Sequence, residues 1–463
     1  MKKRKKRLHG DIAKAIKDLY QKKIDEYYEI LVEHFIASET YDMAAEYSKL
    51  ASKKAEKAGA LTDSIRYTRK GIDSLEKLQI TYELQSKIID ARTTLGLYLF
   101  QMFYFLDAKN AIDPISELAI GGDSKRRIAQ IYTILGAYYF WCKEDMTEAI
   151  RYLELALEIA EETSDVVCLF FANHFLGIMR ASNCEFDKAV NHFNVALNIN
   201  LMRKTTWGIS AVKSALSYWG YSYQSRGDMA FQTSQEALSM AEESGDIYSK
   251  AGAYGSHGYS CFYKGYLHEA EKNILSSVDF CERINLFAWE IQYLIILATV
   301  YLELKNYQKA EMYYAKAFEL ADHNCTDTQP SVLIFCKIQL SLAKFMDRKE
   351  HIDMKKIYSL SAANRLKTQE GWIRRSIGQL LSYTDISHLS EAEKWIKSAI
   401  KEDSRNGAIW HMGMDYAVYA EMFKRKGDRP NAKEKLNRAI KILKRCGADG
   451  WVEKYEKKLT ALL

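Results

Sequence analysis

A pattern of small and large apolar residues recurs along this chain at fixed spacing. Each of three stretches opens with a small residue, places alanine twelve positions later, a large apolar residue four further on, and a small one three beyond that. These stretches begin at Gly177, Gly258 and Ala298. Small residues permit two antiparallel helices to cross closely, and the large residue lies on the same helix face, where it fills the space between neighbouring hairpins. The pattern predicts a series of helical hairpins.

The alanine-type anchor of this pattern can be followed over more than 300 residues. Successive anchors are separated by 37 to 45 residues, and most intervals are 40 or 41. The anchor at Lys355 is inferred from Ala343 and Ala362, in a unit whose spacing is irregular. A period near 40 indicates a solenoid of helix pairs. The predicted anchors are Ala108, Ala149, Ala189, Ala230, Ala270, Ala310, Lys355, Ala392 and Ala432.

The ends of the chain depart from this period. We expect a basic disordered head over residues 1–10, a helical lead-in over 11–80 with amphipathic helices at 11–36 and 41–58, the repeat array over 81–448, and a capping helix with a charged face over 449–463. Asp113-Pro114 can begin or bend a helix inside the array. The chain has only three prolines, which favours an all-α fold.

The repeat resembles the tetratricopeptide repeat, and its length is similar to the long-helix variant of bacterial regulators such as MalT. The resemblance implies a right-handed superhelical solenoid of antiparallel helix pairs. The stretches RLHGDIAKAIKDLYQKKIDEYYEILVEHF and KRKGDRPNAKEKLNRAIKILKRCGADGWVEKYEKKL also resemble the two ends of the C-terminal helical arm in bacterial signalling proteins that carry a cyclase or kinase domain and a STAND-type ATPase. The chain lacks a Gly-Lys dipeptide and therefore a phosphate-binding loop. We expect no ATPase or cyclase activity.

Charge and cysteine usage narrow the function further. The net charge of +6 resides in the head, whose six basic residues leave 60 basic and 60 acidic residues elsewhere. A neutral body gives no nucleic-acid footprint, although the head could act as an electrostatic tether. No stretch is apolar enough to span a membrane. The eight scattered cysteines, Cys325 among them, favour a reducing cytoplasm.

The candidate binding residues are aromatic. In a repeat superhelix the first helix of each pair lines the concave face, and large, stiff aromatic side chains suit binding there, although they also serve as ordinary core. The candidate groove contacts are Phe140, Trp141, Tyr221, Tyr259, Phe262 and Tyr263. We expect no metal or other cofactor, because no histidine cluster has ligand spacing, and we interpret His174, His257 and His411 as core or groove residues.

The residues that follow the small first-helix position, Ile178, Tyr221, Tyr259 and Thr299, do not form a carboxylate clamp. A groove of this kind better suits an extended or helical segment with apolar anchors. The leading hypothesis is a non-catalytic scaffold that binds proteins and acts as the regulatory or sensing arm of a nucleotide-dependent signalling system, with a signalling ATPase or nucleotidyl cyclase module as partner. Two alternatives stay open: a receptor solenoid for a small molecule or peptide, and a non-catalytic fragment of a larger cyclase or ATPase protein.

Overall fold

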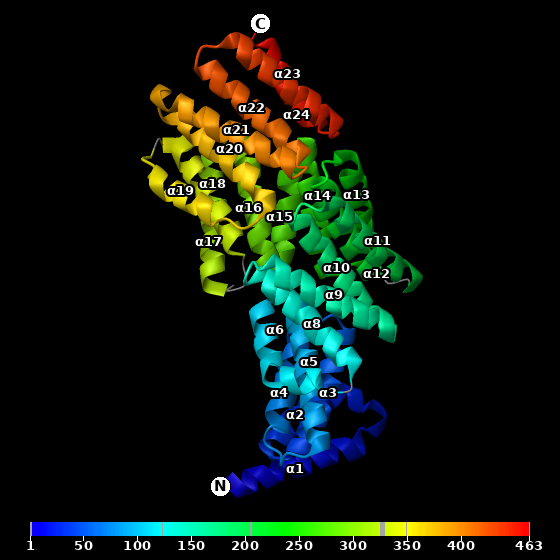
Figure 1. The fold of residues 1–463 in the computed structure, drawn as a ribbon. Coiled ribbons are helices and arrows are strands. Elements are labelled where there is room, and N and C mark those ends of the chain that lie inside the picture. The colour runs from blue at the N-terminus through cyan, green and yellow to red at the C-terminus, as the bar shows by residue number, and fades with distance from the viewer. Residues whose placement is uncertain (1, 123, 204–205, 325–328, 349, 463) are drawn as a thin grey trace. The chain divides into compact units, whose positions relative to one another are not determined.

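The computed structural model describes residues 2–122, 124–203, 206–324, 329–348 and 350–462, and Cys325 lies outside these ranges. Over these residues the chain forms helices and turns without a strand (Figure 1). It divides into two compact units. Unit 1 comprises residues 1–138 and 155–165, and unit 2 comprises residues 139–154 and 166–463. The all-α prediction is confirmed, and the division between the two compact units falls within residues 81–448, predicted as the repeat array.

Unit 1 is a run of helices whose neighbours in sequence pack together. Its elements are α1(Lys2–Leu19), η1(Gln21–Tyr27), α2(Tyr28–Ala37), α3(Tyr41–Lys57), α4(Leu61–Leu75), α5(Tyr82–Gln101), α6(Phe105–Ile112), η2(Asp113–Ile115) and α7(Ser116–Ile120). Helices α8(Lys125–Trp141) and α9(Met146–Thr163) contribute residues to both units.

Unit 1 differs from the sequence expectation at two places. Residues 2–10, expected as a disordered head, belong to α1, because lysine and arginine favour helix and Gly10 is the first residue that disfavours it. The helix expected over 11–36 is broken after Leu19 by a 3₁₀ segment, in which Lys23 leaves helical geometry at φ −136°. The expected bend at Asp113-Pro114 is present, because proline starts the short 3₁₀ turn η2.

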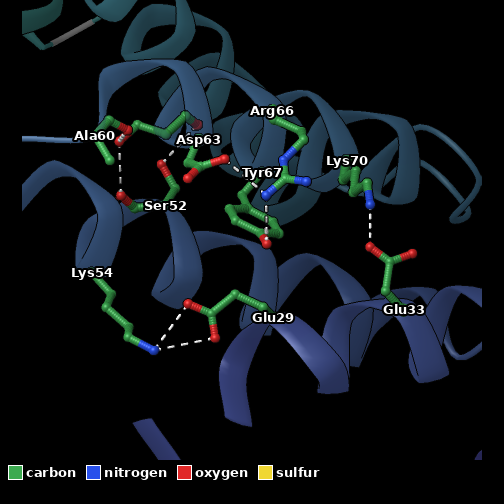
Figure 2. Close-up of polar contacts among 10 residues, drawn as sticks. Glu29, Glu33, Ser52, Lys54, Ala60, Asp63, Arg66, Tyr67 and Lys70 are labelled. Carbon is green, nitrogen blue, oxygen red and sulfur yellow. Dashed lines mark hydrogen bonds and ion pairs between the residues drawn. The ribbon is translucent and has the colours of Figure 1, made fainter. Parts of the chain in front are cut away.

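Charged side chains join α2 to the two helices that follow it (Figure 2). Lys54 of α3 pairs with Glu29 at 2.9 Å, and Lys70 of α4 pairs with Glu33. Arg66 donates to the hydroxyl of Tyr67 at 2.9 Å. These groups are partly exposed, so each pair contributes little to stability on its own.

Unit 2 contains the regular hairpins, in which an even-numbered first helix pairs with the odd-numbered helix that follows. Its elements are α10(Val166–Ser182), α11(Phe186–Arg203), α12(Thr206–Ala215), η3(Leu216–Ser222), α13(Gly227–Ser244), α14(Ile247–Lys264), α15(Leu267–Arg283), α16(Phe287–Glu303), α17(Tyr307–Asn324), α18(Pro330–Arg348), α19(Met354–Ala363), α20(Lys367–Thr384), η4(Ile386–His388), α21(Leu389–Arg405), α22(Ile409–Arg425), α23(Arg429–Arg445) and α24(Asp449–Thr460).

The repeat spacing produces close helix crossings inside each hairpin. A Cβ built on Gly258 would lie 2.5 Å from Ile274, and one on Gly177 would lie 2.7 Å from Phe193. The large apolar residue therefore packs onto the small residue of its own hairpin, and Phe193 also reaches Gly220 of the next hairpin. All predicted alanine anchors are fully buried.

The anchor predicted at Lys355 is wrong. Lys355 is exposed on α19, whereas Ile357 is the buried residue of that helix. Helix α19 has only ten residues and begins at Met354, with Asp353 accepting a hydrogen bond from the Lys356 amide. The buried anchor of this unit therefore lies two residues later than predicted, at Ile357. The interval from Ala310 to this anchor is longer than predicted, and the interval from it to Ala392 is shorter.

Unit 2 closes on itself through contacts between residues far apart in sequence. The Glu144 carboxylate accepts from the Ser331 amide at 2.8 Å, and the Ser225 hydroxyl accepts from the Trp410 amide at 2.8 Å. Among the described residues, six hydrogen bonds span between 185 and 189 residues, and four more span between 147 and 151 residues. These separations, each of roughly four to five repeats, indicate that one turn of helical hairpins packs directly against the next.

Candidate functional site

The first helices of unit 2 surround a cavity with many aromatic side chains, here called the tyrosine cavity. Its volume is about 690 Å³, counted out to its open mouth. Its lining is mostly aromatic, with the amides of Gln292 and Gln369 as the main neutral polar groups. The lining residues are Phe186, Tyr218, Tyr223, Tyr259, Phe262, Gln292, Ile295, Ile296, Thr299, Val332, Phe335, Thr368, Gln369, Trp372, Ala408 and His411.

Tyrosine rings and hydroxyls line one side of this cavity. The rings of Tyr218 and Tyr259 stack with centroids 4.1 Å apart. Behind this wall, the Tyr263 hydroxyl lies 3.1 Å from Nε2 of the lining residue His411. Burial raises the pKa of Tyr218, Tyr259 and Tyr263 well above the ordinary value and lowers that of His411. The phenols therefore remain neutral and can donate hydrogen bonds.

A π-helix places two of these tyrosines. Residues Leu216–Ser222 follow α12 without interruption and form the π-helical segment η3. In a π-helix each backbone hydrogen bond spans five residues rather than four. Tyr218 lies in this segment and Tyr223 directly follows it, and their ring centroids are 5.9 Å apart. Such segments occur frequently at functional sites. Here the segment and the residue that follows it supply two rings to the cavity wall.

A second cavity adjoins the first and is here called the lysine cavity. Its volume is about 1070 Å³, again counted out to its mouth. Four cationic side chains and two carboxylates line it: Lys305, Arg375, Lys454 and Lys458, with Glu303 and Glu421. Phe262, Thr299 and Trp372 line both cavities, and the Phe262 and Trp372 rings are nearly parallel at 6.4 Å. The two cavities thus form one cleft with a shared aromatic wall.

A buried charge cluster supports the wall between these cavities. Arg375 donates to Oδ1 of Asp415 at 2.8 Å and to the His411 carbonyl at 3.2 Å. Burial raises the pKa of Asp415 to about 6, and burial together with the Asp415 charge raises that of Asp403 well above the ordinary value. One proton is therefore retained by the two carboxyl groups near neutral pH, which leaves a single negative charge opposite Arg375.

The structure brings three of the six predicted groove residues together. Tyr259, Phe262 and Tyr263 lie on α14, and each is at most 4% exposed. Tyr259 and Phe262 line the tyrosine cavity, whereas Tyr263 stacks on Trp410 at 4.3 Å behind that wall. Trp372 and Trp410 from later helices pack against Phe262 and Tyr263, so these residues form the floor of a cleft rather than an open surface.

The other three predicted residues do not line either cavity. The Phe140 carbonyl accepts from the Gln329 side chain at 3.2 Å, and the buried Trp141 ring meets Phe140 edge-on at 5.0 Å. Tyr221 is half-buried in η3. The histidines interpreted as core or groove residues are all shielded: burial lowers the pKa of His174 to about 4, and His257 contacts Ser234 at 2.9 Å. Among the described residues no cluster of His, Cys, Asp or Glu is arranged to hold a metal ion.

Several residues that line the two cavities were not predicted from the sequence. Tyr218 and Tyr223 depend on the π-helix, which the regular period does not reveal. Trp372 comes from a hairpin more than a hundred residues beyond α14. Lys454 and Lys458 belong to the capping helix, whose charged face was expected to point outward. A signal that could have indicated them is the unusual density of tryptophan in the last hairpins, where Trp372, Trp410 and Trp451 repeat about every 40 residues.

Comparison with known proteins supports the fold. Residues 127–201 match the sequence model of the tetratricopeptide repeat. The chain is similar to NprR in complex with its cognate peptide NprX, at 14% identity and a TM-score of 0.54, over 76% of this chain and 96% of that one. It is also similar to a Rap protein complexed with competence and sporulation factor, at 16% identity and a TM-score of 0.50, over 88% and 99%.

A third similar structure is the Rap conjugation gene regulator of plasmid pLS20 in complex with the Phr* peptide, at 16% identity and a TM-score of 0.50, over 78% of this chain and 96% of that one. No curated protein matches the chain. Tetratricopeptide-type helical repeats thus describe the fold of this protein. None of the described helices has the length and apolar character needed to cross a membrane.

Proposed function

We propose that this protein is a non-catalytic receptor, and that the cleft of unit 2 binds a short peptide. The observation that carries the proposal is the pair of adjoining cavities with the shared wall of Phe262, Thr299 and Trp372. One cavity offers aromatic surface with neutral hydrogen-bonding groups, and the other offers charged groups. A peptide presents this combination of apolar side chains, backbone amides and charges along one extended segment.

An unpartnered polar atom supports a ligand in the tyrosine cavity. Within the described structure the buried side-chain oxygen of Gln369 accepts no hydrogen bond, and Gln369 lines this cavity. A buried acceptor without a donor costs about 1–3 kcal/mol. A peptide N–H group that reaches this oxygen would remove that cost on binding.

Known complexes of the same fold agree with this proposal. NprR and the pLS20 Rap regulator were both solved in complex with a peptide. The identity of 14–16% transfers no individual contact, so the binding residues proposed here rest on the cavities of this chain. The wider role as a regulatory arm, with a signalling ATPase or nucleotidyl cyclase as partner, stays a prediction from the sequence resemblance.

The test is titration calorimetry of the full chain with pools of synthetic pentapeptides. We expect at least one pool to bind, and Gln369→Ala to weaken this binding by about tenfold, the effect of a lost hydrogen bond in a closed site. Gln235→Ala, on the exposed side of α13, is the matched control and should bind as the parent chain does. Binding that is equal in Gln369→Ala would place the peptide elsewhere. If metabolites or nucleotides bind while no peptide does, the protein is a small-molecule receptor instead.

A further inference from the structure

The lysine cavity carries more positive charge than its own carboxylates neutralise. Lys454 is paired with Glu303 at 3.0 Å, and the charge of Arg375 is taken up by the buried Asp415. The remaining charged groups of the lining are Lys305, Lys458 and Glu421. Within the described residues Lys305 and Lys458 form no ion pair, so two cations face a single carboxylate.

Lys305 and Lys458 both line the cavity, so the excess positive charge lies inside it. Lys454 and Lys458 are one helical turn apart on α24 and therefore lie on the same face, which also carries Tyr455. Lys305 lies in the turn that follows α16. Burial lowers the pKa of Lys458, and the like charges of Lys454 and Lys305 lower it further. The charge of Glu421 acts in the opposite direction and raises this pKa. An anion placed between these ammonium groups would relieve their repulsion.

The neutral groups of the cavity complete a site for a carboxylate on a side chain. Gln379 and Ser382 line it beside the lysines, and Tyr307 and Tyr383 supply aromatic surface. Lysine is a flexible point charge that can approach a carboxylate from several directions. Phe262 and Trp372 line both cavities, so this charged end adjoins the tyrosine cavity.

We infer that the peptide bound by this cleft carries an acidic side chain, held by Lys305 and Lys458 in the lysine cavity, and an apolar side chain in the tyrosine cavity. The inference rests on the proposed peptide-receptor function and adds its specificity. A basic side chain at the same position is disfavoured, since it would meet the two unpaired ammonium groups of Lys305 and Lys458. An amide of equal size loses the charge interaction alone.

The test uses pentapeptide pools that are acetylated and amidated at their ends and identical except for Asp, Asn or Lys at one fixed position. We expect the Asp pool to bind the full chain about tenfold more tightly than the Asn pool, and the Lys pool to bind most weakly. The advantage of the Asp pool should shrink as ionic strength rises, because the mouth of the cavity is open to solvent.

Lys458→Met and Lys305→Met should each reduce the preference for Asp over Asn by several-fold and leave Asn binding unchanged. Lys457→Met is the matched control, because Lys457 lies on the same helix but is exposed and pairs with Glu453 at 2.6 Å. Equal binding of the Asp and Asn pools, or an unchanged preference in both lysine variants, overturns the inference while peptide binding itself stands. If no pool binds, the proposed function fails together with it.

Discussion

The two units of this protein use the same helical hairpin in different ways. In unit 1, polar contacts join neighbouring hairpins: Tyr98 donates to Glu56, 42 residues away, and Arg127 donates to Ser86, 41 residues away. In unit 2, Trp451 donates to the Phe262 carbonyl across 189 residues, and Lys264 reaches Asp449 across 185. Unit 1 thus resembles an open solenoid, whereas unit 2 forms a closed turn.

This comparison shows where an interior site can arise in a repeat protein. A hairpin that contacts only its neighbours leaves its first helix facing solvent. When a later turn packs against an earlier one, first helices from distant hairpins face each other, and the space between them becomes a cleft. The same packing buries the charges of Arg375 and Asp415, which explains why the fully buried ion pair of the described residues lies in unit 2.

The largest expected effect comes from removal of the tryptophan that closes the turn. Trp451 is fully buried and donates through Nε1 to the Phe262 carbonyl at 2.8 Å. Trp451→Ala should destabilise unit 2 by about 4 kcal/mol, typical of a large buried aromatic replaced by alanine. Hydrogen exchange measured by mass spectrometry should show faster exchange in α14 and α24, and no change in α3 and α4. Faster exchange in both units alike would contradict the separation of the two regions.

The next effect concerns the buried carboxyl groups of Asp415 and Asp403, whose replacement by asparagine should change stability in opposite directions. Asp415→Asn removes the partner of the buried Arg375 and should cost about 3 kcal/mol. Asp403 has a raised pKa, so its contribution to stability is present at low pH and is lost as pH rises through that value. Asp403→Asn mimics the protonated form and should raise the melting temperature relative to the parent chain more at pH 8 than at pH 5. A parallel pH dependence in both proteins would contradict this assignment.

Lys264 of unit 2 provides a smaller test, which is matched by Lys70 of unit 1 in the prediction that follows. Lys264 is buried between Asp228 at 2.6 Å and Asp449 at 2.5 Å. Lys264→Met should cost about 1–2 kcal/mol, because it removes one ion pair to the neighbouring hairpin and one across the closed turn. Both carboxylates are exposed and regain water, which limits the loss. Urea denaturation followed by tryptophan fluorescence would measure it. A loss as large as that of Asp415→Asn would mean that Lys264 holds the closed turn alone.

The smallest effect is expected at the corresponding pair of unit 1. Lys70 and Glu33 join α4 to α2, and both are partly exposed (Figure 2). Lys70→Met should therefore change stability by about 0.5 kcal/mol or less, as surface pairs do. Hydrogen exchange of α2 and α4 would report it. A cost above that of Lys264→Met would reverse the order expected from burial.

The helical hairpins could be predicted from the sequence, because they depend on the spacing of residues close together in the chain. The alanine anchors and their facing glycines follow from residues twelve to sixteen positions apart, and the structure confirms that they are buried. The closed turn depends on a small rotation added at each repeat, which no local pattern records. Consequently Tyr259 and Phe262 were assigned to an open groove, while Trp372, His411 and Lys458, which face them from later hairpins, were not joined to them.

Local interruptions of the repeat also could not be predicted from its period. The π-helix η3 and the shifted anchor at Ile357 both interrupt a regular repeat, and each changes which side chains face inward. Gly371 is a further example: a Cβ there would lie 1.9 Å from Asp403, so the buried carboxyl group depends on a glycine that the pattern alone marks only as a small residue.

The central claim is that a peptide binds inside the closed turn of unit 2. The most direct measurement is hydrogen exchange of the full chain with and without the tightest-binding peptide pool. We expect slower exchange in α14, α20 and α24, whose residues line the cleft, and unchanged exchange in α2 to α4 of unit 1. Protection confined to unit 1, or absent from α14 and α20 at saturating peptide, would contradict it.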